Sequence, residues 1–170
     1  MGLENIVKFH YWVGEKTRDT LMDLSEEEFK QDHGEILGSI QTKVEHIIFA
    51  LLTCFNILGV QVDYLDPNFE KTVKKIQSFS RRELLAYWKK LDKKLVNEFN
   101  EDLAGTVTVQ RLDSDSFCLK RDDFLLQYIL HTIYHRGQLN YCLKALNKKR
   151  IEGDYLFYFD ELETALHSDY

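Results

Sequence analysis

Apolar residues recur at helical spacing along four long stretches of the chain. Ser39 and Ser80 stand at N-cap positions of two of them, and Ser80 opens a Ser-x-x-Glu capping box with Glu83. Gly59 and Gly105 stand where left-handed C-terminal caps are common. The predicted long helices cover residues 5–24, 39–59, 80–105 and 122–150.

The fourth stretch is the longest and is predicted to be the central helix. Asp122 and Asp123 open it, and a basic group at residues 148–150 closes it, which is the charge order that the helix dipole favours. Apolar residues cover most of its circumference, and helices of that kind are buried. We therefore expect the other helices to pack around this one.

The connections are predicted to be less regular. A capping box at Ser25–Glu28 begins a short helical piece, whereas residues 60–79 contain the turn Asp66-Pro67-Asn68 and are predicted to form a long connection. Residues 106–120 alternate apolar and polar positions, as a small β-hairpin or an extended crossover would. The aromatic residues of 155–159 need covering, either by the bundle or by a homodimer contact. The predicted fold is all-α, a four-helix bundle with this hairpin or crossover before the last long helix.

Composition adds limits on size, partners and location. The 170 residues, 44% of them hydrophobic, can bury one core, so residues 1–170 are predicted to form a single domain. The net charge of −6 argues against nucleic acid as a partner. No leader pattern and no run of about 18 apolar residues is present, so we expect a cytoplasmic protein without a membrane partner. The three cysteines form no CxxC pair, which indicates reduced core residues rather than disulfides or a zinc ribbon.

Two histidines on the last long helix are the first candidates for chemistry. His131 and His135 stand at i and i+4, so they project from the same side and can share a metal ion. Buried histidines bonded to a carbonyl or a carboxylate are the alternative. Arg136 and Gly137 follow directly, and a mid-helix glycine costs about 1 kcal/mol relative to alanine. Two locally unfavourable residues beside two histidines favour a functional site.

A third ligand should come from a facing helix, because bundles build metal sites in that way. His46 is the best candidate, since it lies inside an apolar run of the second long helix. The alternative is a histidine at the edge of a core stripe. His10 and His33 lie toward an end or a loop, and His167 lies in the tail.

These residues carry a resemblance to a known family. The string SIQTKVEHIIFALL, which contains His46, is followed some eighty residues later by HTIYHRGQ, which contains His131 and His135. This combination resembles the DinB-like (DNA-damage-inducible) family, which includes the YfiT-type metal-dependent hydrolases. The helix pattern matches over nearly the whole chain, including the opening FHYW.

The resemblance implies a site and a choice of functions. His46, His131 and His135 would bind one divalent ion, nickel or zinc, with manganese or iron as further candidates. Three neutral imidazoles leave open positions for substrate, as catalytic sites do, so no further catalytic residue is expected. Family members are often homodimers. The implied activity is transfer of a low-molecular-weight thiol such as bacillithiol to an electrophile. The alternatives are hydrolysis of an amide or ester, and a non-catalytic, stress-related metal-binding or interaction bundle.

Residues near the histidines are predicted to have structural roles. Arg136 and Gln138 are expected to bond a neighbouring helix or loop, and Gly137 to permit close helix approach. Aromatic residues are candidates for pocket walls, with ordinary core packing as the alternative, and these are Tyr11, Trp12, Phe49 and Tyr128.

Overall fold

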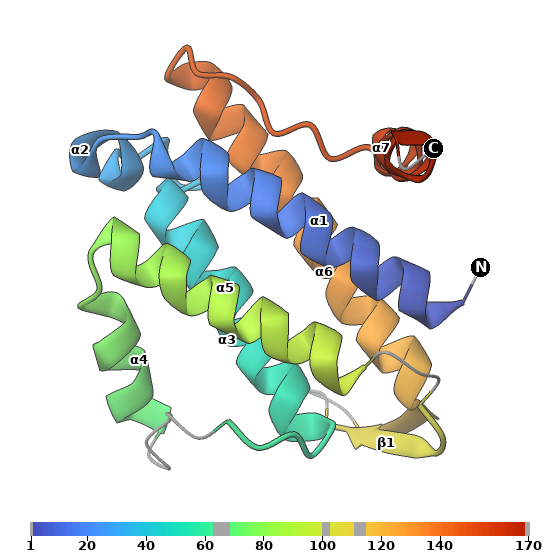
Figure 1. Cartoon of the computed structure of the whole chain (residues 1–170). Coiled ribbons are helices and arrows are strands. Elements are labelled where there is room, and N and C mark those ends of the chain that lie inside the picture. The colour runs from blue at the N-terminus through green and yellow to red at the C-terminus, as the bar shows by residue number, and fades with distance from the viewer. Residues whose placement is uncertain (1, 63–68, 100–102, 111–114, 169–170) are drawn as a thin grey trace.

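A computed structural model describes residues 2–62, 69–99, 103–110 and 115–168, with side chains left out at 163 and 165–168 (Figure 1). Its four long helices are α1 (Leu3–Met22), α3 (Ile40–Ile57), α5 (Arg81–Glu98) and α6 (Arg121–Ala145). Helices α1 and α3 each pack against both α5 and α6. Each long helix thus has two long neighbours, which confirms the predicted four-helix bundle.

Three helices begin at serine caps. Ser25, Ser39 and Ser80 each accept a hydrogen bond from the backbone N–H three residues on, and each completes a capping box. The first of them starts the short helix α2 (Glu26–Lys30). Gly59 adopts φ +72° directly after α3 ends, as its position predicted. Local hydrogen bonding therefore decides where these helices begin and end.

One predicted connection and two predicted helix ends are wrong. Residues 60–79 are not one long connection, because α4 (Phe69–Gln77) forms there and buries Thr72 and Ile76, one turn apart. Helix α5 ends at Glu98 rather than near Gly105. Helix α6 ends at Ala145, and Asn147 leaves it at φ 55°, so the basic group at 148–150 lies beyond the helix. The predicted turn at Asp66-Pro67-Asn68 lies outside the described residues.

The hairpin prediction is confirmed. Strand β1 (Thr106–Val109) pairs antiparallel with β2 (Phe117–Lys120), and Thr106 lies opposite Lys120. Both strands contact α6 near its start. The predicted turn at 113–116 lies partly outside the described residues.

The last helix, α7 (Tyr155–Ser168), lies against α1 on the outside of the bundle (Figure 1). The ring of Phe9 contacts those of Tyr155 and Tyr158 edge-on, with centroids 4.9 and 5.8 Å away. Of the two predictions for this aromatic segment, packing on the bundle therefore holds for Tyr155 and Tyr158. Phe157 and Phe159 stay exposed.

Helix α6 is not buried all round, contrary to the prediction. In a four-helix bundle a helix has two neighbours, so one side of it stays outside whatever its residues are. The exposed apolar residues of α6 are Leu130 (53%), Ile133 (42%), Tyr134 (65%) and Tyr141 (69%).

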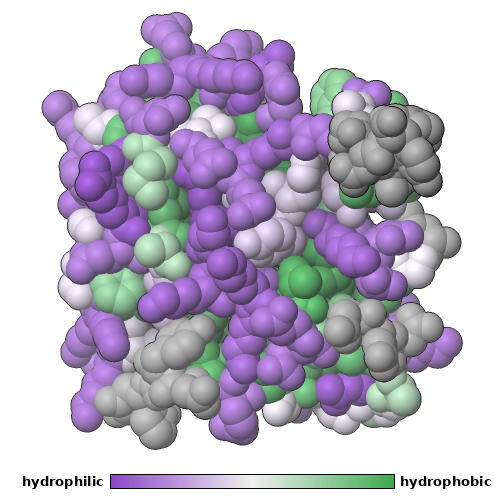
Figure 2. Space-filling model, viewed as in Figure 1, coloured by the Kyte–Doolittle hydropathy of each residue, from purple (hydrophilic) through white to green (hydrophobic). Residues whose placement is uncertain are grey.

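Hydrophilic residues cover most of the face shown in Figure 2, and hydrophobic residues show mainly in the furrows between them. No helix in the described ranges is both long and apolar enough to span a membrane.

Candidate metal centre

The three predicted histidines lie together where α3 packs against α6. His46 comes from α3, and His131 and His135 come from successive turns of α6. The Nε2 atom of His131 lies 3.1 Å from Nε2 of His46 and 3.1 Å from Nε2 of His135. The three histidines offer ligand atoms that all lie within 4.8 Å of one another. The structure therefore brings together residues that are 85 positions apart in the sequence.

This spacing fits one divalent ion. Metal–nitrogen bonds of about 2.0–2.1 Å separate neighbouring ligand nitrogens by about 2.9 Å in an octahedral site and about 3.3 Å in a tetrahedral one. The observed 3.1 Å lies between these values. The Nε2 of His131 carries either one proton or one lone pair, so ordinary hydrogen bonding accounts for at most one of its two contacts. Imidazole nitrogens suit zinc, nickel and iron, and they bind manganese more weakly.

Gln138 determines which nitrogen of His135 faces the other two rings. The Nδ1 of His135 lies 2.8 Å from Oε1 of Gln138. The amide oxygen can only accept, so Nδ1 carries the proton and Nε2 presents its lone pair to the centre. The prediction that Gln138 bonds a neighbouring helix or loop is wrong, because it bonds His135 on its own helix. Its position three residues after His135 was the signal for the contact that the structure shows.

All three imidazoles favour the neutral form that a metal needs. Burial is the main cause that lowers the pKa of His46, His131 and His135 below the ordinary value. The neighbouring imidazoles add to this effect at His46 and His135. His135 is buried at 7% exposure, whereas His46 is exposed. The centre is thus anchored in the bundle on one side and open to solvent on the other.

An apolar slot of about 290 Å³ adjoins His46 and His131. It lies between α3 and α6, and its other lining residues are Phe49, Ala50, Thr53, Cys54, Phe124, Gln127 and Tyr128. Two of the four aromatic candidates, Phe49 and Tyr128, are thus pocket walls, whereas Tyr11 and Trp12 are not in this lining. Burial raises the pKa of Cys54 to about 12, so its thiol stays protonated and unreactive at neutral pH.

A second polar cluster lies inside the bundle between α1, α5 and α6. Arg18 pairs with Asp92, and His10 Nε2 lies 3.4 Å from the other Asp92 oxygen. His10 Nδ1 lies 3.2 Å from the hydroxyl of Thr132, which also accepts from Arg136. All five residues are buried. His10 belongs to this cluster and is not among the three converging histidines.

In this cluster Asp92 and Arg136 are charged, whereas His10 is neutral. Burial lowers the pKa of His10 more than Asp92 raises it, so His10 is neutral. Burial opposes ionisation of Asp92, but His10, Arg18 and Arg136 outweigh it and lower the pKa of the carboxyl. Burial also lowers the pKa of Arg136 to about 10, which leaves it charged at neutral pH. Sequence reasoning missed this cluster, although Asp92 lies one turn after buried Trp88, inside the apolar stripe of its helix.

Two glycines differ in what surrounds them. A Cβ on Gly14 would lie 2.7 Å from Oδ2 of Asp92, so only glycine leaves room for the buried carboxylate. Nothing lies within 4 Å of the position of a Cβ on Gly137. The prediction that Gly137 permits close approach of another helix is therefore wrong within the chain.

The fold and the site together define a helical-bundle protein with a three-histidine candidate metal centre. The chain belongs to the DinB family, whose model matches residues 1–164. No curated protein matches the chain.

Proposed function

We propose that this protein is a metal-dependent enzyme that transfers a low-molecular-weight thiol to an electrophile. The observation that carries the proposal is the convergence of the Nε2 atoms of His46, His131 and His135. These residues would hold one nickel or zinc ion, or manganese or iron. A divalent ion with three neutral ligands lowers the pKa of a coordinated thiol or water and so supplies the nucleophile.

The residues around the centre would order the reactants. His135, held by Gln138, keeps its lone pair directed at the centre, and exposed His46 marks the side from which small molecules enter. The slot between α3 and α6 would take the apolar part of the electrophile, because its walls are mostly aromatic and aliphatic. No additional protein base is needed in this scheme.

Turnover assays test the proposal. Metal-loaded protein is mixed with bacillithiol or glutathione and a fluorogenic electrophile, and His131→Ala is the comparison. We expect a thiol-dependent rate that falls by at least 100-fold in the variant. His33→Ala, outside the centre, should keep the rate. Equal rates for wild type and His131→Ala would contradict the proposal.

The same assays separate the other two functions. Turnover of an amide or ester that thiol does not accelerate would assign hydrolysis instead. A large drop in melting temperature with chelator, with no turnover on any panel, would assign a structural metal in a stress-related binding bundle. Elemental analysis of protein purified without an affinity tag identifies the metal.

We also propose that the protein is a homodimer that pairs through α6. Leu130, Ile133, Tyr134 and Tyr141 project from one side of this helix at i, i+3, i+4 and i+11 and are exposed. Gly137 lies in the middle of this stripe with open space above it. An isologous contact would place α6 of one protomer on α6 of its partner, with the glycines allowing close approach.

A further inference from the structure

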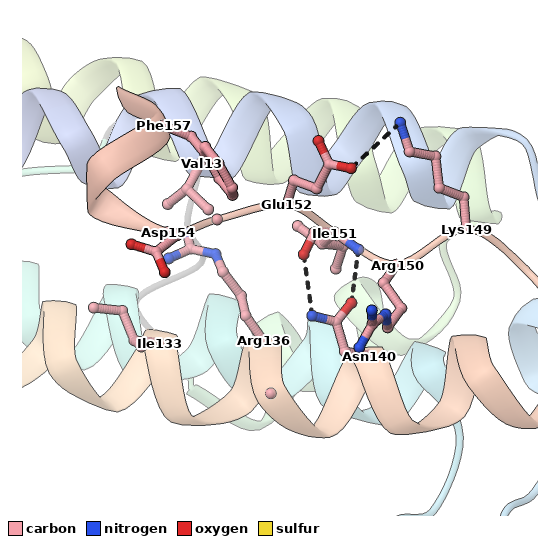
Figure 3. A pocket seen from close by; sticks show the side chains of 12 residues that line it. Val13, Ile133, Arg136, Asn140, Lys149, Arg150, Ile151, Glu152, Asp154 and Phe157 are labelled. Carbon is pink, nitrogen blue, oxygen red and sulfur yellow. Dashed lines mark hydrogen bonds and ion pairs between the residues drawn. The ribbon is translucent and has the colours of Figure 1, made fainter. Parts of the chain in front are cut away.

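A cavity of about 710 Å³ lies on a different side of α6 from the three histidines. Figure 3 shows α6 and α1 as two of its walls, with the segment from Lys149 to Asp154 running across between them. It shares no lining residue with the slot beside the histidines. Arg136 lines it and follows His135 directly, so the two side chains leave α6 about 100° apart.

Arg136 presents an unused edge to this part of the structure. Its side chain reaches from α6 toward α1 and is 4% exposed (Figure 3). Its Nη1 donates to the hydroxyl of Thr132 at 3.3 Å, whereas Nε and Nη2 have no partner among the described residues. Nε and Nη2 form one side of the guanidinium, the fork that binds a carboxylate or phosphate with two parallel hydrogen bonds.

The charge of Arg136 is only partly compensated by Asp92. The one carboxylate in the buried cluster, Asp92, is paired with Arg18, and His10 is neutral. Two guanidinium groups and one carboxylate leave a net positive charge inside the bundle. A buried charge that is only partly compensated is costly, so an anion beside Arg136 would be stabilised.

The acidic residues of the cavity have other partners. Glu152 pairs with Lys149 at 3.8 Å. Oδ1 of Asp154 accepts from the backbone N–H of Leu156 and so caps the start of α7. Arg150 adds another exposed cation to the lining. Three cations and two carboxylates line the cavity, so its formal net charge is positive.

The wall opposite α6 is held in place by specific contacts. Asn140 donates to the carbonyl of Ile151 at 3.1 Å and accepts from its N–H at 2.7 Å (Figure 3). Gly153 packs against α1 so closely that a Cβ there would lie 2.5 Å from Cγ2 of Val13. The cavity is thus a defined feature of the fold, formed by a fastened segment.

We propose that this cavity binds a small organic anion, whose carboxylate or phosphate group bonds to Nε and Nη2 of Arg136. Lys149 and Arg150 face the remainder of the molecule. Nε and Nη2 of Arg136 are buried, so binding includes a small local rearrangement of side chains that line the cavity. The site is separate from the histidine centre and does not depend on the metal chemistry proposed there, whereas Ile133 and Gly137 belong both to its lining and to the stripe on α6.

Nuclear magnetic resonance of the ¹⁵N-labelled protein tests this site directly. The Nε–H resonance of Arg136 is assigned by its loss in Arg136→Lys, and acetate and inorganic phosphate are titrated separately at pH 7. We expect a saturable shift of this resonance and of the Gly153 amide with at least one of the two. The Nε–H resonance of Arg18, which is paired with Asp92, should stay in place. Response to acetate alone indicates a carboxylate ligand, and response to phosphate alone a phosphate ligand.

A matched pair of surface variants keeps the test valid if Arg136→Lys fails to fold. Arg150→Gln removes a cation of the cavity, and Arg82→Gln removes an exposed cation at the start of α5. We expect Arg150→Gln to weaken anion binding by threefold or more and Arg82→Gln to leave it unchanged. Shifts that sodium chloride reproduces at equal ionic strength, or equal binding by both variants, would overturn the proposal.

Discussion

His135 shows how a neighbouring residue prepares a ligand before any ion is bound. Its Nδ1 is held by Gln138 at 2.8 Å, so the ring cannot turn and the proton cannot move to Nε2 without losing this bond. At the scale of single residues, the orientation of a candidate ligand thus depends on Gln138, which is not itself a candidate ligand.

Replacing Gln138 should weaken metal binding without unfolding the protein. In Gln138→Leu the acceptor is lost, and we expect metal affinity to fall roughly 10–100-fold, as is common for such partners of ligands. Gln138→Glu keeps an acceptor oxygen and is the matched control. Competition with a chromophoric chelator measures both affinities, and equal values for the two variants would contradict this role.

His10 should make stability depend on pH near neutrality. Burial lowers its pKa in the folded protein, whereas in the unfolded chain it titrates near 6.5. Between these values the unfolded chain binds the extra proton, so the free energy of unfolding decreases as the pH falls through 6.5 toward the lower pKa of the folded protein. Urea denaturation at several pH values should give a flatter profile for His10→Gln.

The same experiment contains its control. His46, His131 and His135 have lowered pKa values too and contribute in the same direction in metal-free protein. The wild type and His10→Gln share these three contributions, so the difference between their profiles isolates His10. Parallel profiles would mean that His10 is not held neutral.

At the scale of elements, the pairing of α3 with α6 forms both the centre and its slot. Ala50 lies one turn after His46 on α3 and lines the slot. Its small side chain leaves the space that a larger residue would fill.

Ala50→Phe should block the slot and leave the metal bound. We expect unchanged metal content and at least a tenfold loss of kcat/KM for a bulky apolar electrophile, with a smaller loss for a compact one. Ala86→Phe makes the same change at an exposed position of α5 and should have no effect. Steady-state kinetics with both substrates checks this, and a loss of metal in Ala50→Phe would show that the change disturbs the centre itself.

At the scale of the whole molecule, the exposed stripe on α6 is the feature that a monomer does not explain. Contiguous exposed apolar residues commonly mark an interaction surface. The stripe lies on the same helix as His131 and His135, so dimer formation would bury surface close to the centre.

Sedimentation equilibrium tests the dimer. We expect the wild type to have twice the monomer mass and Tyr134→Glu to dissociate, because a charge in the middle of an apolar contact is costly to bury. Phe117→Glu introduces the same charge on β2, outside the stripe, and should stay dimeric. A wild type that is monomeric at high concentration would contradict the proposal.

Several local features could be predicted because each depends on residues close in sequence. Ser39 and Ser80 bond to their own helices, and His131 and His135 share a side of α6 through helical geometry alone. Helix α4 was missed because only Thr72 and Ile76 of its nine residues are buried, which is too short a pattern to detect. The buried cluster of His10, Asp92 and Arg136 was missed because its members lie on three different helices.

The sequence by itself determined the starts of α2, α3 and α5 and the spacing of His131 and His135, since these follow from hydrogen bonds and periods within a few residues. The family resemblance predicted that His46 joins that pair, and tertiary structure places its Nε2 3.1 Å from that of His131. Tertiary structure alone decided that His10 is neutral beside Asp92 and that one edge of Arg136 has no partner. These properties depend on which faces of distant helices pack together and on how much water that packing removes, and neither quantity is contained in local sequence.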